Sequence, residues 1–288
     1  MDRLRSSAYG KLNLMLDITG RREDGYHTLE TVMQTVSLRD TVEIRFKKGG
    51  GIVLRCDLPY VPSDSRNIAW KAADAFLKAA GLTRSMEIDI RKTIPVGGGM
   101  GGGSTDAAAV LRMLNRMFGF PLTLEQLDAV ALTLGADVPF CLRRGTYLAE
   151  GVGEVLTEAP AMTDCQIVLC KPRVSVSSKS AFGLYDEYEP KTHPDARAML
   201  DALASGDLDR IAASLGNSFE PPIAAANPEI AAVRSRLLEL GALNATMTGS
   251  GSVVFGLYGD ASAAHRAKDI LRQAGWRAYC VHPVGSGR

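Results

Sequence analysis

Hydrophobic and polar residues alternate in several short stretches of this chain, which is the pattern of β-strands that bury one face. Strands are expected over residues 11–18, 28–38, 41–46, 52–55, 86–90, 145–149, 166–170, 252–258 and 276–281. The third and fourth of these flank Gly49-Gly50-Gly51, a spacing that is typical of a hairpin. The N-terminal third of the chain is therefore predicted to be mostly sheet.

Other stretches repeat hydrophobic residues every three or four positions, as the buried face of a helix does. Helices are expected over residues 67–80, from a glycine-rich run to 118, and over 123–134, 196–203, 207–215, 227–240 and 261–274. Asn67, Thr123 with Gln126, and Asn227 before Pro228 are suitable helix starts. The pattern predicts a mixed α/β protein.

The chain length bears on the number of domains. One hydrophobic core stops growing at about 250–300 residues, and this chain has 288. We therefore expect two domains, over residues 1–157 and 158–288, with the boundary close to Pro160.

The glycine-rich run is Pro95-Val96-Gly97-Gly98-Gly99-Met100-Gly101-Gly102-Gly103-Ser104-Thr105, with six glycines in seven residues. A predicted strand precedes it and a predicted helix follows, whereas a flexible linker would continue in polar residues. Glycines let successive backbone N–H groups converge on one point, and the start of a helix carries a partial positive charge. The run is therefore predicted to be a strand-to-helix turn that binds phosphate.

Two common phosphate-binding motifs do not fit this run. A Walker A loop has a lysine directly before its serine or threonine, and no lysine precedes Ser104. A dinucleotide-binding motif needs an acidic residue at a strand end about 20 residues further on, but Glu125 and Asp128 fall in a predicted helix. We expect a nucleotide triphosphate loop of another kind, with its cation supplied from elsewhere in the chain.

The composition excludes several classes of protein. With 46% hydrophobic residues, 23% charged residues and a net charge of +1, the chain lacks the strongly basic surface expected of a nucleic-acid-binding protein. It has no apolar run of about 18 residues and no charged-then-apolar leader or transit peptide, so we expect a cytoplasmic, bacterial protein with no membrane partner. None of its five cysteines are spaced as C-x-x-C, which favours reduced thiols over a zinc site.

Three further segments carry candidate chemistry. Lys11 opens a predicted strand beside Asn13, Asp137 follows a predicted helix end, and Thr248-Gly249-Ser250-Gly251-Ser252 forms a second glycine turn with hydroxyl groups. Taken singly, these are better explained as a solvated strand end, a turn residue and a tight turn. Taken together with the glycine-rich run, they supply what a kinase needs to hold a triphosphate and to place an acceptor hydroxyl.

These segments resemble the motifs of the GHMP superfamily of small-molecule kinases, and the resemblance runs from residue 8 to residue 255. Within the superfamily the chain is most similar to kinases that act on a cytidine-linked polyol. Two segments are specific to that group, Gly25-Tyr26-His27 and Gly135-Ala136-Asp137-Val138-Pro139. Between residues 183 and 248 the resemblance is loose, so no substrate contact is carried over there.

The resemblance implies a two-domain α/β (α+β) fold, with an N-terminal ribosomal-protein-S5-like ATP-binding domain and a C-terminal ferredoxin-like α/β sandwich. It implies ATP and Mg²⁺ as cofactors. The implied small-molecule partner is cytidine-diphospho-methylerythritol, phosphorylated on its 2-hydroxyl in the non-mevalonate isoprenoid precursor route. We expect no nucleic-acid partner and a monomer or weak homodimer.

The resemblance also implies roles for single residues around ATP. The run from Pro95 to Thr105 would surround the ATP phosphates, with the Ser104 and Thr105 hydroxyls near the γ-phosphate and Ser104 as a candidate contact of Mg²⁺. Asn67 and Lys92 would flank the adenine.

Further roles concern the substrate. Lys11 and Asp137 match the catalytic pair of the superfamily, while Asn13 and Thr248 would lie at the acceptor. His27 would read the edge of the cytosine, and Tyr26 and Phe182 would stack on its faces. Without the resemblance, His27 is better explained as a structural histidine in a turn, and Phe182 as a core aromatic.

Two alternatives stay open at the level of the sequence. The chain could be another kinase on the same scaffold, acting on homoserine, mevalonate or galactose, or a related ATP-dependent decarboxylase. The Gly25-Tyr26-His27 turn argues against these, because such relatives have no cytosine to read. It could also be a ligand-binding member without activity, but Lys11 and Asp137 are both present.

Overall fold

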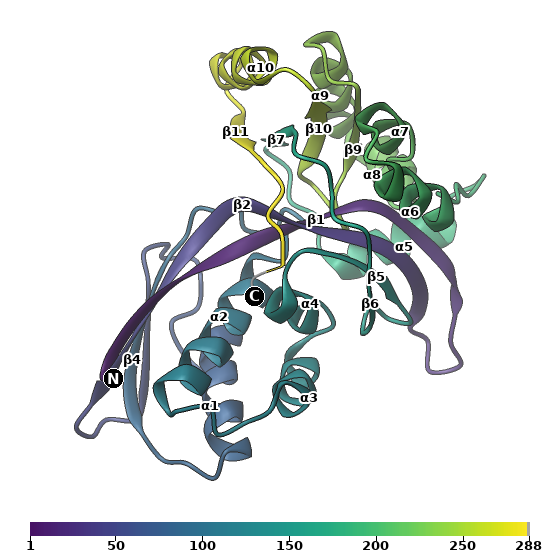
Figure 1. The fold of residues 1–288 in the computed structure, drawn as a ribbon. Coiled ribbons are helices and arrows are strands. Elements are labelled where there is room, and N and C mark those ends of the chain that lie inside the picture. The colour runs from purple at the N-terminus through teal and green to yellow at the C-terminus, as the bar shows by residue number, and fades with distance from the viewer. Residues whose placement is uncertain (287–288) are drawn as a thin grey trace. The chain divides into compact units, whose positions relative to one another are not determined.

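The computed structural model describes residues 1–286, and the chain divides into two compact units (Figure 1). The first unit contains Met1–Gly10, Leu38–Val96 and Gly101–Arg143, and the second contains Lys11–Ser37, Gly97–Met100 and the chain from Arg144 onward. Both units contain strands and helices, so the predicted mixed α/β class is confirmed. The predicted domain boundary at residues 157 and 158 stays a prediction.

Two long strands run through both units. β1 (Arg3–Arg21) begins well before the predicted strand, and β2 (His27–Lys47) joins two strands that the sequence analysis had separated. The interruption was predicted at residues 39 and 40, and Asp40 is fully buried in the structure. Its carboxylate accepts hydrogen bonds from the backbone N–H groups of Thr93 and Ile94, at 2.5 and 2.8 Å. Because these bonds replace water, the strand continues through a charged residue.

In the first unit the later part of β2 pairs antiparallel with β4 (Ser85–Arg91), and β4 pairs parallel with β3 (Ile52–Cys56). The predicted hairpin between residues 41–46 and 52–55 is therefore wrong, because β4 pairs with both strands. Parallel neighbours need a long connection that crosses over the sheet. α1 (Ile68–Ala79) provides it between β3 and β4.

The helices of the first unit are α1, α2 (Gly102–Met117), α3 (Leu124–Leu134) and α4 (Asp137–Arg143). The predicted caps are confirmed, since Asn67 accepts the Ala69 N–H at 2.9 Å and Thr123 forms a capping box with Gln126. Seven residues are too few to show a helical period, and α4 was missed for that reason.

In the second unit the first part of β2 pairs antiparallel with β5 (Thr146–Glu150), which also pairs with β6 (Val155–Glu158). The short β8 (Gly216–Asn217) pairs parallel with β1. A separate antiparallel sheet has the order β11-β7-β10-β9. Its strands are β7 (Gln166–Lys171), β9 (Asn244–Met247), β10 (Val254–Tyr258) and β11 (Arg277–Val281).

The helices of the second unit are α5 (Ser178–Glu187), α6 (Ala196–Ser205), α7 (Leu208–Ala213), α8 (Glu220–Ala226), α9 (Pro228–Glu239) and α10 (Ala261–Gln273). α9 packs on β9 and β10, and α10 packs on β7 and β11. The sequence analysis missed α5, of which only Ala181 and Tyr185 are buried, and α8, which has two prolines in its first turn. Asn227 precedes α9 as predicted, but its side chain donates to the Ile223 carbonyl oxygen of α8.

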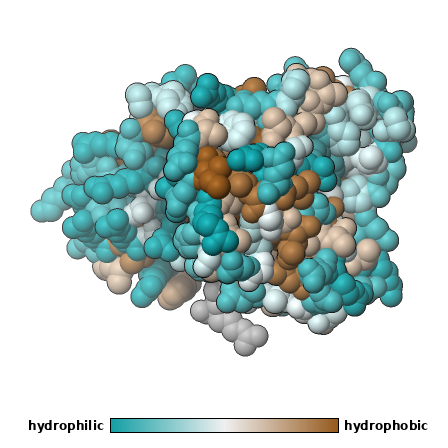
Figure 2. Space-filling view, turned by 90° about the horizontal axis from the view of Figure 1, so that it is seen from above, coloured by the Kyte–Doolittle hydropathy of each residue, from teal (hydrophilic) through white to brown (hydrophobic). Residues whose placement is uncertain are grey.

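Polar residues cover most of the face shown in Figure 2, and hydrophobic residues gather in a patch within it. The buried hydrophobic side chains come from the sheets and from the inner faces of the helices. Among residues 1–286, no helix is long and apolar enough to cross a membrane.

Candidate active site

The glycine-rich run connects β4 to α2, as predicted. Gly97, Gly99 and Gly101 have φ angles of +64°, +76° and +65°, a left-handed conformation that costs other residues about 1–2 kcal/mol each. Gly101 is the N-cap of α2, and no described side chain caps this helix start. The first N–H groups of α2 are therefore left to a ligand, and the helix dipole favours an anion there.

The two glycine turns that the sequence analysis singled out lie against each other. A Cβ atom on Gly99 would come within 2.1 Å of the carbonyl oxygen of Thr248, and a Cβ on Gly249 within 2.9 Å of the carbonyl oxygen of Gly99. The N–H of Val253 donates to the carbonyl oxygen of Gly98 at 3.2 Å. Backbone meets backbone at this point, so only glycine fits in either turn.

Lys11 and Asn13 join this arrangement from β1. The backbone N–H of Lys11 donates to the carbonyl oxygen of Met100 at 3.0 Å, and its ammonium donates to the Asn13 Oδ1 at 2.7 Å. The backbone N–H of Asn13 donates to the Thr248 hydroxyl at 3.0 Å. Three predicted site residues from opposite ends of the chain thus form one buried cluster with the glycine-rich run.

Thr31 completes the cluster and was missed by the sequence analysis. Its hydroxyl accepts from the Asn13 Nδ2 at 2.8 Å and donates to the Met15 carbonyl oxygen at 2.6 Å. These bonds fix which way the Asn13 amide faces, and hence where the Lys11 ammonium points. A single threonine in an apolar strand gives no sequence signal for this role.

Asp137 is the first residue of α4 and lies in the first unit. Its side chain is only partly buried. The carboxylate lies in the first turn of the helix, where the N–H groups stabilise negative charge. An ionised carboxylate at this position can accept a proton or orient a hydroxyl group.

His27 and Phe182 are 155 positions apart in sequence but stack on each other, with ring centroids 4.6 Å apart and planes at 13°. The His27 Nε2 lies 2.7 Å from the Asp186 Oδ1, so it is the natural donor to that carboxylate. The same ring meets Tyr185 edge to face. The imidazole is therefore held in one orientation by α5, a helix that the sequence analysis did not foresee.

Tyr26 differs from its neighbour. Tyr26 as a whole residue is 67% exposed, whereas the side chain of His27 is only 9% exposed. Tyr26 also lies in the polar turn between β1 and β2, where its N–H donates to Asp24. Its ring is thus available to a ligand but is not positioned by packing.

Two of the remaining predicted ATP residues, Asn67 and Thr105, already have side-chain hydrogen bonds within the protein. The Asn67 side chain caps α1 and donates to the Pro62 carbonyl oxygen at 2.7 Å. The Thr105 hydroxyl donates to the Tyr9 carbonyl oxygen at 2.6 Å, and Ser104 is half-buried in the first turn of α2. In the rest of the run, Pro95, Gly98 and Met100 are buried, Gly102 is half-buried, and Val96 and Gly103 are exposed.

Lys92 lies between two buried carboxylates. Its ammonium is 2.5 Å from the Asp40 carboxylate, 2.6 Å from the Asp106 carboxylate and 3.3 Å from the Gly102 carbonyl oxygen. Burial alone would lower the pKa of Lys92, but the neighbouring Asp106 and Asp40 carboxylates together raise it above its usual value. At Asp106 the effect of burial is larger than the opposing effect of the Lys92 charge, so the pKa of that carboxyl is raised to about 7. This cluster holds β2, β4 and the first turn of α2 together.

Asp40 and Asp106 were not among the predicted site residues. The available signal for Asp40 was a charged residue inside an otherwise apolar strand pattern. Asp106 has one carboxylate oxygen, Oδ1, that is buried without a hydrogen-bond partner in the described structure. An unsatisfied buried oxygen is costly, so Asp106 is the residue of this cluster most suited to a protonated form or to an added ligand.

Lys171, at the end of β7, supports the second glycine turn and was also missed. Its ammonium donates to the Ser252 hydroxyl at 2.8 Å and to the Pro172 carbonyl oxygen at 3.0 Å. Burial lowers the pKa of Lys171. The lysine thereby fixes the end of the turn that begins at Thr248.

Comparisons with known proteins place this arrangement in a family. The model of the GHMP kinases N terminal domain matches residues 67–145, and that of the GHMP kinases C terminal domain matches residues 199–277. The chain therefore belongs to the GHMP kinases and is an ATP-dependent small-molecule kinase.

Relatives that match over nearly their full length show to which group of GHMP kinases the chain belongs. The chain is 41% identical to the 4-diphosphocytidyl-2-C-methyl-D-erythritol kinase of Desulfitobacterium hafniense, over 97% of this chain and 96% of the relative. It is 37% identical to the kinase of the same name from Clostridium beijerinckii, over 94% and 96%. Within the GHMP kinases it thus belongs to the family of these kinases.

A solved structure agrees with this placement. The crystal structure of a 4-(cytidine 5'-diphospho)-2C-methyl-D-erythritol kinase superposes with a TM-score of 0.83 at 36% identity, over 98% of this chain and 100% of that one. The fold and the sequence therefore point to the same group of kinases.

The packing of the two glycine turns gives a test. We expect Gly99→Ala to lower the free energy of unfolding by clearly more than Gly50→Ala. Both residues have positive φ, which costs an alanine about 1–2 kcal/mol, but a Cβ on Gly50 meets open space. Only Gly99→Ala should also weaken ATP binding, by at least about tenfold, or about 1.4 kcal/mol.

Denaturant unfolding and nucleotide titration of the two variants measure these effects. Equal losses of stability together with unchanged ATP affinity in both would show that the contact between the turns is unimportant.

Proposed function

We propose that this chain transfers the γ-phosphoryl group of ATP to the 2-hydroxyl of 4-diphosphocytidyl-2-C-methyl-D-erythritol, giving the 2-phosphate and ADP. The observation that carries the proposal is the identity of 41% over nearly the whole chain to a kinase named for that substrate. The stacked pair His27 and Phe182 supports it, because a partly buried pair of aromatic rings, next in sequence to the exposed Tyr26, suits a flat base.

The cytosine would bind at this pair. His27 has one ring nitrogen at Asp186, which leaves the other nitrogen and the backbone to read the base edge. Tyr26 and Phe182 would stack on the base, and stacking of this kind is worth about 1–3 kcal/mol per base. In this proposal Asp186 acts through His27, by fixing its tautomer and its orientation.

The triphosphate would bind along the residues from Pro95 to Thr105. The left-handed glycines and the uncapped start of α2 supply N–H groups for its oxygens. Each hydrogen bond to a charged phosphate oxygen is worth about 1.5–3 kcal/mol. Asn67 and Lys92 would lie beside the adenine, with Lys92 acting from within its carboxylate cluster.

Mg²⁺ would arrive with the nucleotide and neutralise charge on the phosphates. No group of three or more His, Cys, Asp or Glu side chains in the described part of the chain is arranged to hold a metal ion. This fits Mg²⁺, which usually takes one or two protein ligands and completes its shell with phosphate oxygens and water. Ser104, in the first turn of α2, is the protein ligand we propose.

Asp137 cannot remove the proton from the hydroxyl before transfer begins. An alcohol has a pKa close to that of water, about 15.7, and an aspartate has about 3.9, so prior ionisation is uphill by about 12 units. In a loose transition state the attacking oxygen becomes acidic as its bond to phosphorus forms. Asp137 would orient the hydroxyl and accept the proton at that stage.

Lys11 would stabilise the negative charge that develops during transfer and support Asp137 in its role. Its ammonium is held by Asn13, which the Thr31 and Thr248 hydroxyls fix in turn. A charge that is already oriented needs no reorganisation when the reaction occurs. Asn13 and Thr248 would thus act at the acceptor mainly by positioning Lys11.

A substrate panel tests the proposed function. The purified chain is given ATP, Mg²⁺ and one acceptor at a time: the cytidine-diphospho-methylerythritol, homoserine, mevalonate or galactose. We expect ADP release only with the first, and a single new phosphate monoester in the ³¹P NMR spectrum of the product. Turnover of another acceptor in its place would overturn the substrate assignment, and binding of nucleotides without any turnover would favour a non-catalytic member.

Replacing Asp137 tests the mechanism. We expect Asp137→Asn to lower kcat by at least about 10²-fold with little change in ATP affinity, because an amide cannot accept the proton. Asp74→Asn serves as the control, since Asp74 is a surface residue paired with Lys78. Steady-state kinetics and ATP titration of both variants give the comparison, and near-normal turnover by Asp137→Asn would remove Asp137 from the mechanism.

A further inference from the structure

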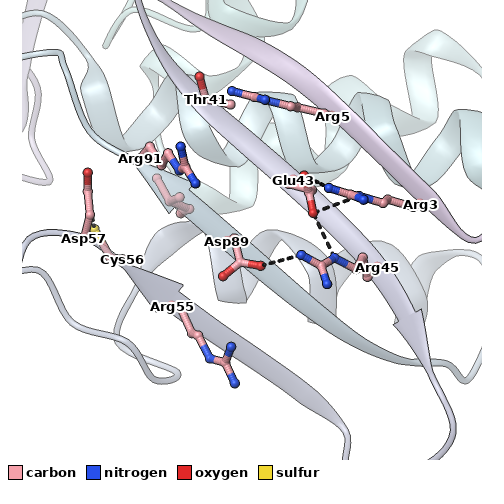
Figure 3. A pocket seen from close by; sticks show the side chains of 11 residues that line it. Arg3, Arg5, Thr41, Glu43, Arg45, Arg55, Cys56, Asp57, Asp89 and Arg91 are labelled. Atoms are coloured by element: carbon pink, nitrogen blue, oxygen red, sulfur yellow. Dashed lines mark hydrogen bonds and ion pairs between the residues drawn. The ribbon is translucent and has the colours of Figure 1, made fainter.

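A charged pocket of about 440 Å³ opens in the first unit, over strands β1 to β4 (Figure 3). Five arginines line it: Arg3, Arg5, Arg45, Arg55 and Arg91. Only three carboxylates, those of Glu43, Asp57 and Asp89, line it with them. None of these residues belongs to the proposed kinase machinery.

The strand period explains why charges gather on this side. Val42, Ile44 and Ile88 are buried on one face of the sheet. Residues one position away, such as Glu43 and Asp89, point to the opposite face. Glu43 faces Asp89 in the register of β2 and β4, and Asp89 faces Arg55 in that of β3 and β4. The face away from the core is therefore mostly charged.

Most of these charges neutralise one another. Glu43 accepts two hydrogen bonds from Arg3, at 3.0 and 2.8 Å, and one from Arg45 at 2.8 Å. The hydrogen bonds from Arg3 and Arg45 lower the pKa of Glu43 to about 2, so this carboxylate stays ionised. Arg55 pairs with Glu87 at 2.6 Å. These three arginines already have carboxylate partners.

Arg5 and Arg91 are different. In the part of the chain that the structure describes, residues 1–286, neither makes an ion pair or a side-chain hydrogen bond. Both are exposed, and Figure 3 draws both guanidinium groups with no dashed line, beside Thr41. Thr41 is directly opposite Arg91 in the register of β2 and β4. Two guanidinium groups without a protein partner among residues 1–286, together with one hydroxyl, thus line one pocket.

We propose that this pocket is a binding site for a small phosphorylated molecule, whose phosphate group is held by Arg5, Arg91 and Thr41. Guanidinium forks match the oxygens of a phosphate, and a dianion satisfies two of them at once. The volume lies within the range of small-molecule sites. A nucleic acid is disfavoured, because it would need an extended basic surface and the chain carries a net charge of only +1.

The proposed site lies next to the ion pair that anchors the glycine-rich run. Thr41 follows Asp40 and Arg91 precedes Lys92, and the Asp40–Lys92 pair anchors the glycine-rich run through Thr93 and Ile94. A ligand that restrains Thr41 and Arg91 would therefore also restrain their neighbours in the chain, Asp40 and Lys92, which form that anchor. The proposed site does not depend on the proposed kinase reaction.

Arginine side-chain NMR tests the site directly. Inorganic diphosphate is titrated into the full chain while the Nε–Hε signals are followed, assigned with Arg5→Gln, Arg91→Gln and Arg55→Gln. We expect the Arg5 and Arg91 signals to move together along one saturation curve, and more weakly as salt rises. In Arg5→Gln the Arg91 signal should saturate at a diphosphate concentration at least about tenfold higher, the loss expected for one charged contact.

Arg55→Gln is the matched control, since Arg55 lines the same pocket but already pairs with Glu87. We expect this variant to keep the diphosphate affinity within about twofold, as most surface substitutions do. All three arginines are exposed, so each variant should fold, and unchanged thermal midpoints would confirm this. Shifts that do not saturate, or equal weakening in Arg55→Gln and Arg5→Gln, would overturn the proposal.

Discussion

The contact between the backbones of Gly99 and Thr248 is the constraint on which the site depends. A Cβ on Gly99 would lie 2.1 Å from the Thr248 carbonyl oxygen, which no side chain tolerates. The same turn supplies the Met100 carbonyl oxygen to the Lys11 N–H, and Thr248 supplies its hydroxyl to the Asn13 N–H. Segments from the start, the middle and the end of the sequence are thereby held in register by main-chain contacts that need glycine.

Buried charges form the second constraint. The side chains of Lys92, Asp40 and Asp106 are almost entirely buried, and each would be costly to bury alone. Together they tie the end of β4 and the first turn of α2 to β2. Lys11 is buried too, and its ammonium is oriented by an amide that two threonine hydroxyls hold. In both clusters a lysine ammonium is held in one direction, which suits a protein that binds polyanions.

Structural features that depend on residues close together in the chain were predicted from the sequence. The helix caps at Asn67 and Thr123 and the strand-to-helix turn at the glycine-rich run are local, and each was predicted correctly. The wrong predictions concern strand continuation and strand pairing, which are determined by residues far apart in the chain. β2 continues past Asp40 because Thr93 and Ile94 satisfy that carboxylate, and β3 pairs with β4 because α1 crosses between them. The hairpin was expected from local spacing, and local spacing contains no information on the continuation of β2 or on the pairing of β3 with β4.

The same distinction applies to the site. The residues named from motifs, such as Lys11, Asn13 and Thr248, do come together. The residues that hold them, Thr31 and Lys171, carry no local signal, because their importance lies only in contacts made across the fold. His27 is an intermediate case: its motif was visible, but its stacking on Phe182 and its bond to Asp186 depend on a helix that the hydrophobic pattern did not reveal.

The central claim is that backbone N–H groups at the start of α2 hold the nucleotide phosphates. Backbone amide NMR during titration with ATP and Mg²⁺ tests it most directly, since each glycine of the run gives its own signal. The account predicts saturable shifts concentrated at Gly101, Gly102, Gly103 and Ser104. Saturable ATP binding that leaves those signals in place would contradict it.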